Sequence, residues 1–130
     1  MSQVILVALG GAIGSVARWT ASGLINRSLP DATLPYGTLS VNVIGSFAIG
    51  FLGATTMDRG LLAEPVRLLL FVGVLGGFTT FSTFSFETLI LIRTGAVVSA
   101  LTSVGLHLVL CLGSVAIGNW LGRALTGGAA

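Results

Sequence analysis

Charged side chains are scarce in this chain of 130 residues, lysine is absent, and there is a single cysteine. Asp, Glu, Lys and Arg make up 8% of the residues, and all six basic residues are arginines. Because these arginines are few and scattered, no patch that binds nucleic acid is expected. The single cysteine, Cys111, excludes an intrachain disulfide and a cysteine-cluster metal site. We expect it to pack as a small residue against lipid or protein.

Charge is missing above all from the beginning of the chain. The first 17 residues carry no charged side chain. A cleaved signal peptide starts with a basic region ahead of its apolar run, so we do not expect one here. Hydrophobic residues make up 54% of the chain, and with so little charge this is not the composition of a soluble domain.

Four apolar stretches are each long enough to cross a bilayer, which takes about 20 helical residues. They run over residues 4–24, 36–56, 66–92 and 96–121. The segments between them hold all three prolines and six of the ten charged residues. The sequence therefore predicts an all-α membrane protein whose single domain, residues 1–130, is a bundle of four transmembrane helices.

Small residues recur at every fourth position in three of these spans. Such spacing lets helix backbones approach closely, within one chain or between chains. The residues are Gly10 and Gly14, then Ser46 and Gly50, then Ser114, Gly118 and Gly122.

The arginines are balanced across the membrane. With four spans, both termini and the second loop share one side. Three arginines lie on that side and three on the other: Arg59, Arg67 and Arg123 against Arg18, Arg27 and Arg93. The positive-inside rule then favours neither orientation. We expect both orientations to insert and to pair antiparallel, unless one arginine or another factor fixes a single orientation.

The third span holds an unusual density of polar groups. Five hydroxyls fall within seven residues, at Thr79, Thr80, Ser82, Thr83 and Ser85. If the residues after Gly77 are helical, Thr80, Thr83, Phe84 and Glu87 share one face, with Phe81 beside Phe84. Polar groups are costly in hydrocarbon, so we expect this face to handle something that crosses or binds within the membrane. Alternatively, the hydroxyls only bond back to carbonyls of their own helix.

The glycine pair Gly76–Gly77 predicts a break in the same span. Freed carbonyls at a break form a site for a hard cation, and the N-terminus of the following half-helix favours an anion. A simple glycine kink is the alternative.

Other polar residues in the spans allow two interpretations each. Asn42 either donates to an anion or joins two helices by hydrogen bonds. Arg18, near the end of the first span, is either an interfacial anchor beside Trp19 or part of a positive vestibule. His107 and Glu87 alone do not make a metal site or a hydrolytic triad, and we expect His107 to be a packing residue.

Three stretches together resemble the Fluc/CrcB fluoride channels. They are residues 10–19 (GGAIGSVARW), 37–42 (GTLSVN) and 76–85 (GGFTTFSTFS). The third is highly specific, although Phe78 stands where leucine is common. The resemblance covers all four spans.

This resemblance implies a passive fluoride channel in the inner or plasma membrane that lowers cellular fluoride. It implies an antiparallel, dual-topology homodimer with two pores and a buried structural Na⁺, which is not transported and is held by the backbone carbonyls of Gly76 and Thr79 of each subunit. The fluoride pathway would include Asn42, Phe81, Ser82, Thr83, Phe84, Glu87 and the vestibule residue Arg18.

The physics of fluoride suits these residues. Hydroxyls and amides replace water as donors to a strongly hydrated anion, and the electropositive edges of phenylalanine rings attract it. A fixed Na⁺ lowers the barrier for an anion. Glu87 is the exception, because a carboxylate repels an anion unless it is protonated or paired with hydroxyls. No step requires bond chemistry, so we predict a channel and not an enzyme.

Two other functions fit the length and the topology. A small dual-topology drug or cation transporter is one, but small multidrug transporters carry their key acid in the first span, where this chain has only Arg18. A purely structural membrane subunit is the other, and it would not need the hydroxyl-rich run.

Overall fold

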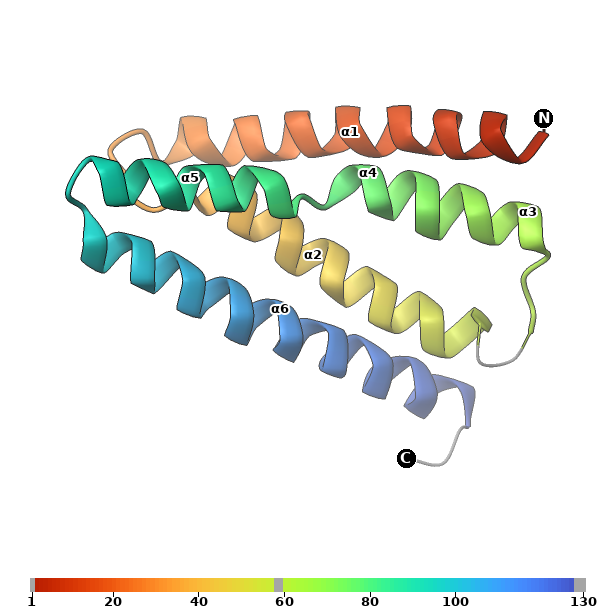
Figure 1. Ribbon diagram of the computed structural model, residues 1–130. Coiled ribbons are helices and arrows are strands. Elements are labelled where there is room, and N and C mark those ends of the chain that lie inside the picture. The colour runs from red at the N-terminus through yellow and green to blue at the C-terminus, as the bar shows by residue number, and fades with distance from the viewer. Residues whose placement is uncertain (1, 58–59, 128–130) are drawn as a thin grey trace.

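The chain folds into a bundle of helices, seen in a computed structural model that describes residues 2–57 and 60–127. The helices are α1 (Ser2–Ser28), α2 (Tyr36–Leu52), α3 (Glu64–Arg67), α4 (Gly76–Phe78), α5 (Phe81–Arg93) and α6 (Val97–Thr126) (Figure 1). Two π-helical segments, η1 (Gly53–Met57) and η2 (Leu68–Leu75), extend α2 and join α3 to α4. The described residues contain no strand.

Four helical stretches are long and apolar enough to span a membrane, as predicted. They are Gln3–Ser28, Tyr36–Thr56, Glu64–Arg93 and Val97–Thr126. The first extends four residues beyond the predicted boundary at residue 24, and the last extends five beyond residue 121. Both extensions consist partly of polar residues, several of which hydrogen-bond to backbone groups of the protein.

Two pairs of elements form most of the bundle. α6 lies along α2, and α1 lies along η2 and α4 (Figure 1). Glycines make both contacts close. A Cβ atom at Gly14 would overlap the carbonyl oxygen of Val74, and one at Gly118 would overlap that of Phe47. The small-residue spacing in the sequence is thus used for packing within the chain.

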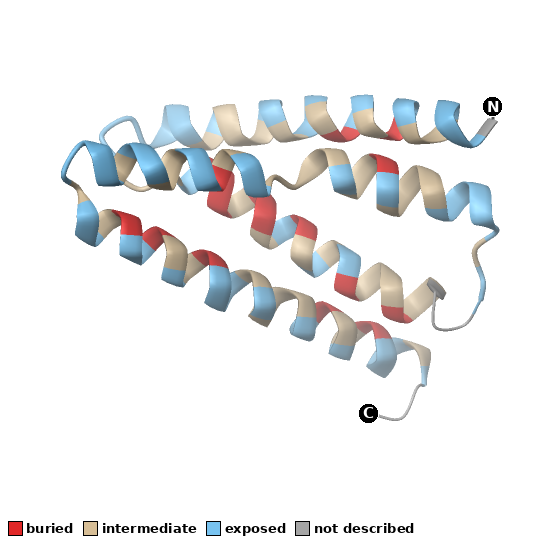
Figure 2. Cartoon of the chain, viewed as in Figure 1, coloured by how far each residue is buried: buried red, intermediate tan, exposed pale blue. Residues whose placement is uncertain are grey.

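Burial is concentrated on α2. Its buried residues include Thr38, Leu39, Val41 and Asn42. Figure 2 shows buried positions also on the face of α6 that lies toward α2, whereas much of α1 and α5 is exposed. Large apolar side chains cover the outside of the bundle, as expected of a surface that meets lipid tails.

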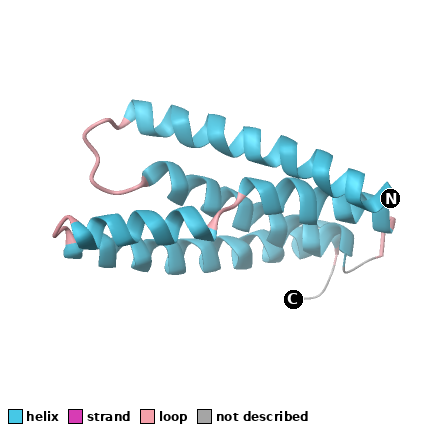
Figure 3. Ribbon diagram, turned by 45° about the horizontal axis from the view of Figure 1, so that its top comes forward, coloured by secondary structure: helices cyan, strands magenta, loops and turns pink. Residues whose placement is uncertain are grey.

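The third span is broken, as predicted, but the break begins after the glycine pair. Gly76 and Gly77 are helical, and Thr79 and Thr80 are extended, with φ and ψ of −89° and 156° and of −151° and 112°. Figure 3 shows the break as a short loop within the span. Gly77 is instead needed for packing, since a Cβ there would lie 2.7 Å from the carbonyl oxygen of Gly11.

We predict that Gly14→Ala destabilises the bundle, whereas Gly11→Ala does not. The added methyl at Gly14 meets the backbone of Val74 and Phe78, while one at Gly11 meets nothing within 4 Å. Forced separation of packed backbones costs about 1–3 kcal/mol, and alanine at an open helical site is neutral or stabilising. Thermal unfolding of both variants in detergent measures the difference, and equal midpoints would contradict the role of Gly14 in packing.

Candidate functional site

The break at Thr79–Thr80 is held by the side chain of Asn42 from α2. The amide of Asn42 donates from Nδ2 to the carbonyl oxygen of Thr80 at 3.0 Å and accepts at Oδ1 from the Thr80 N–H at 2.8 Å. Asn42 is buried. The interpretation of Asn42 as a hydrogen-bonding link between helices is therefore confirmed, and one Nδ2 hydrogen remains as a donor.

The hydroxyl of Thr80 caps the N-terminus of α5. It accepts from the Thr83 N–H at 3.1 Å and donates to the Thr83 hydroxyl at 2.9 Å, and the Ser82 hydroxyl lies 3.2 Å from it. Three of the five hydroxyls in the third span thus form one cluster at a helix N-terminus, where the partial charge of the helix is positive. The hydroxyl hydrogen of Thr83 remains available as a donor.

The other two hydroxyls behave as the simpler alternative predicts. Thr79 donates to the carbonyl oxygen of Leu75 at 3.0 Å, and Ser85 donates to that of Phe81 at 2.8 Å. Both therefore satisfy backbone groups of their own span.

The break removes the helical hydrogen-bond partners of several backbone carbonyls, among them those of Gly76 and Thr79. In a continuous helix the carbonyl oxygen of Gly76 would accept from the N–H of Thr80, which here donates to Asn42. No hydrogen bond from a described residue reaches the carbonyl oxygens of Gly76 or Thr79. Both residues line an open cavity of about 380 Å³, together with Asn42, Thr80 and Phe81.

Arg18 lies at the level of the break and not at the end of its helix. α1 continues to Ser28, so the prediction that Arg18 lies near the end of the first span is wrong. The polar residues after position 24 continue the helix because no proline occurs before Pro30. The Nε atom of Arg18 donates to the carbonyl oxygen of Gly77 at 3.0 Å, a favourable position for a cation at the end of a half-helix.

The two phenylalanines at the start of α5 lie beside each other but differ in burial. The ring centroids of Phe81 and Phe84 are 5.4 Å apart, with the rings tilted by 60°. Phe84 is buried against His107, at a centroid distance of 4.1 Å, whereas the side chain of Phe81 is 78% exposed. His107 packs as predicted, and its Nδ1 lies 2.9 Å from the carbonyl oxygen of Ser103.

Glu87 is paired with a hydroxyl that sequence reasoning did not single out. Thr38, which is buried on α2, donates to Oε1 of Glu87 at 2.8 Å. The other carboxyl oxygen is buried and has no partner among the described residues. Thr38 lies four residues before Asn42, so the period of a helix places both on one face, and this signal was available in the sequence.

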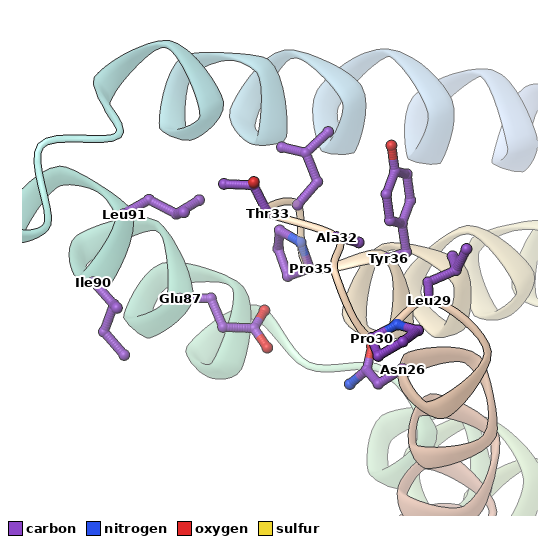
Figure 4. Close-up of a pocket in the computed structure, with 11 residues that line it drawn as sticks. Asn26, Leu29, Pro30, Ala32, Thr33, Pro35, Tyr36, Glu87, Ile90 and Leu91 are labelled. Carbon is purple, nitrogen blue, oxygen red and sulfur yellow. The ribbon is translucent and has the colours of Figure 1, made fainter.

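Hydrogen bonds thus join polar residues of α2 to polar residues of the third span. The face predicted for α5 is present, with Thr83, Phe84 and Glu87 on the helix and Thr80 as its cap. Glu87 also lines a second cavity of about 280 Å³ near the first loop (Figure 4). No group of three or more His, Cys, Asp or Glu side chains gathers among the described residues, so a cation here depends on backbone oxygens.

We predict that Asn42→Leu lowers the free energy of unfolding by about 2 kcal/mol or more. The substitution leaves the N–H and the carbonyl of Thr80 without their partner, and each unsatisfied buried group costs about 1–3 kcal/mol. Asn119→Leu is the matched control, because the half-buried Asn119 side chain makes no hydrogen bond to a described residue. Denaturant titration in micelles measures both variants, and an equal effect would show that the Asn42–Thr80 pair contributes nothing.

Comparison with known proteins identifies the family. Residues 5–119 match the family described as CrcB-like protein, Camphor Resistance (CrcB). Proteins named fluoride-specific ion channel FluC are similar over nearly the whole chain. That of Methylobacterium radiotolerans is 47% identical over 128 residues, covering 96% of this chain and 87% of its own. That of Opitutus terrae is 48% identical over 125 residues, covering 95% of this chain and 91% of its own length.

These matches agree with the resemblance that residues 10–19, 37–42 and 76–85 carry. The prediction of a multi-pass membrane protein that is a channel and not an enzyme is confirmed. The chain belongs to the CrcB family of fluoride-specific ion channels.

Proposed function

We propose that this protein is a fluoride-selective channel that lets fluoride leave the cell passively. The observation that carries the proposal is the hydroxyl cluster at the N-terminus of α5, built on a break inside the membrane. Similarity to channels named as fluoride-specific supports it. Donors fixed at a positive helix end replace part of the water that a small anion loses on leaving solution.

The proposed pathway follows the polar face of the third span. Asn42 supplies its remaining amide hydrogen, and Ser82 and Thr83 supply hydroxyls. Phe81 and Phe84 offer ring edges, which are electropositive. Fluoride thus passes from donor to donor without a step in which it is bare in an apolar environment.

Arg18 and Glu87 belong to the same pathway in the proposal. The Nη groups of Arg18 make no hydrogen bond to a described residue, so they attract anions while Nε stays on Gly77. Glu87 accepts a hydrogen bond from the hydroxyl of Thr38. That hydrogen bond offsets part of the repulsion between a carboxylate and a passing anion.

The functional unit in the proposal is an antiparallel homodimer with one chain inverted and two pores. The equal numbers of arginines on the two sides support both orientations. The exposed ring of Phe81 and the open cavity beside it support a protein partner at this face. A lone chain would leave the free carbonyls of Gly76 and Thr79 in contact with lipid, which the bilayer does not tolerate.

A structural Na⁺ between the two chains completes the proposed assembly. Its ligands are the carbonyl oxygens of Gly76 and Thr79, which no described donor occupies and which suit a hard cation. One chain offers two such oxygens, too few for a cation site, and two symmetric copies offer four. When bound, the ion supplies a fixed positive field that favours an anion nearby.

The drug-transporter alternative has less support. The charged residues of the first span are both arginines, Arg18 and Arg27, and Arg18 is engaged with Gly77. No carboxylate is present there to bind a cationic drug or to exchange protons.

We predict that the reconstituted protein releases fluoride from liposomes without ATP and without a proton gradient. Chloride should leave far more slowly, because fixed donors suit a small anion. Fluoride and chloride electrodes measure both rates, with protein-free liposomes as the control for leak. Equal rates for the two halides would end the claim of selectivity, and proton-driven export of a cationic dye would favour the transporter.

We also predict that Phe81→Ile and Phe84→Ile each lower fluoride flux at least tenfold, which corresponds to about 1.4 kcal/mol on the barrier. Isoleucine keeps apolar bulk but removes the electropositive ring edge. Phe86→Ile is the matched control, since Phe86 lies on the same helix, is exposed and is outside the proposed pathway. If all three variants assemble and conduct like the wild type, the phenylalanines serve only for packing.

A further inference from the structure

The start of α2 is fixed by a side chain from another helix. Its N-cap residue, Pro35, offers no side-chain hydrogen bond. Asn26, in the last turn of α1, takes that role, because its Oδ1 accepts from the Gly37 N–H at 3.1 Å. A cap of this kind satisfies one of the N–H groups that every helix N-terminus leaves unpaired.

The contact between the two helices at this point is tight. A Cβ atom at Gly37 would lie 2.5 Å from Oδ1 of Asn26 and 2.8 Å from the carbonyl oxygen of Ser22. Glycine is therefore required at position 37 for the backbone of α2 to reach the side chain of Asn26. The first turn of α2 is held against α1 by this one hydrogen bond and by close packing.

The residue that follows Gly37 is the partner of Glu87. Thr38 is 4% exposed, and its hydroxyl donates to Oε1 of Glu87 at 2.8 Å. Gly37 and Thr38 are consecutive residues in one helical turn, so a shift of the Gly37 amide moves Thr38 with it. Asn26 and Glu87 line the same cavity, one from α1 and the other from α5 (Figure 4).

We propose that Asn26 is a positioning residue for permeation, acting through Gly37 to hold Thr38 on the carboxyl group of Glu87. The inference rests on the proposed fluoride channel and adds to it a residue of the first helix, outside the polar face of the third span. Without the cap, the first turn of α2 frays and the hydroxyl of Thr38 moves away from Oε1 of Glu87. The carboxyl group of Glu87 then loses its hydrogen bond from Thr38.

The test compares fluoride efflux from liposomes for Asn26→Leu, Asn26→Asp and the matched control Ser28→Ala. Leucine removes the acceptor, and aspartate keeps an oxygen in the same place. Ser28 lies in the same turn but bonds only to Leu24 of its own helix. We expect Asn26→Leu to lower flux about fivefold, the factor that corresponds to one helix cap, and Asn26→Asp and Ser28→Ala to stay near the wild type in high salt, where the added charge is screened.

A double-mutant cycle separates positioning from a general loss of structure. If Asn26 acts through Thr38, Asn26→Leu should have little further effect in a Thr38→Val background. An equal fold-loss in both backgrounds, wild-type flux in Asn26→Leu, or failure of Asn26→Asp to restore flux would each overturn the proposal. Where Asn26→Leu does not assemble, Asn26→Ser, whose hydroxyl is too short to reach Gly37, takes its place with the same expected loss. Absence of fluoride flux in the wild type would instead refute the proposed function.

Discussion

A broken helix inside a membrane must satisfy its own backbone, and the Asn42–Thr80 pair meets that requirement here. One buried amide accepts from the N–H and donates to the carbonyl of the same residue. An amide is suited to this task because it carries both a donor and an acceptor. Thr80 can therefore remain extended at a depth where water does not compensate for lost hydrogen bonds.

Two further polar contacts depend on that break. The half-helix before it ends at Phe78, and the side chain of Arg18 pairs with its Gly77 carbonyl. The half-helix after it starts at Phe81 and is capped by the hydroxyl of Thr80. The helix end that carries negative partial charge thus faces a cation, and the end that carries positive partial charge faces hydroxyls and open space. A continuous helix of the same composition would offer neither end within the membrane.

The sequence predicts the spans well and the long-range contacts poorly. Apolar length alone identifies all four spans, and the glycine pair identifies the region of the break. The exact position of the break depends on Asn42, which lies 38 residues from Thr80, so no local pattern near Gly76 reveals it. The same limit applies to Arg18, whose partner is 59 residues away. The position of Arg18 within its apolar stretch suggested that it lies near a helix end. The helix α1 instead continues to Ser28, because no proline interrupts it.

The exposed side of the break is the feature that the proposed second chain would cover. The carbonyl oxygens of Gly76 and Thr79 accept no hydrogen bond from any described residue, and the ring of Phe81 is largely uncovered beside them. Lipid cannot satisfy carbonyls. The same face therefore combines unpaired polar groups with exposed apolar surface. In the proposed assembly an inverted copy covers the ring of Phe81, and a cation between four carbonyl oxygens satisfies the backbone. A single interface would then cover the apolar ring and pair the polar carbonyls.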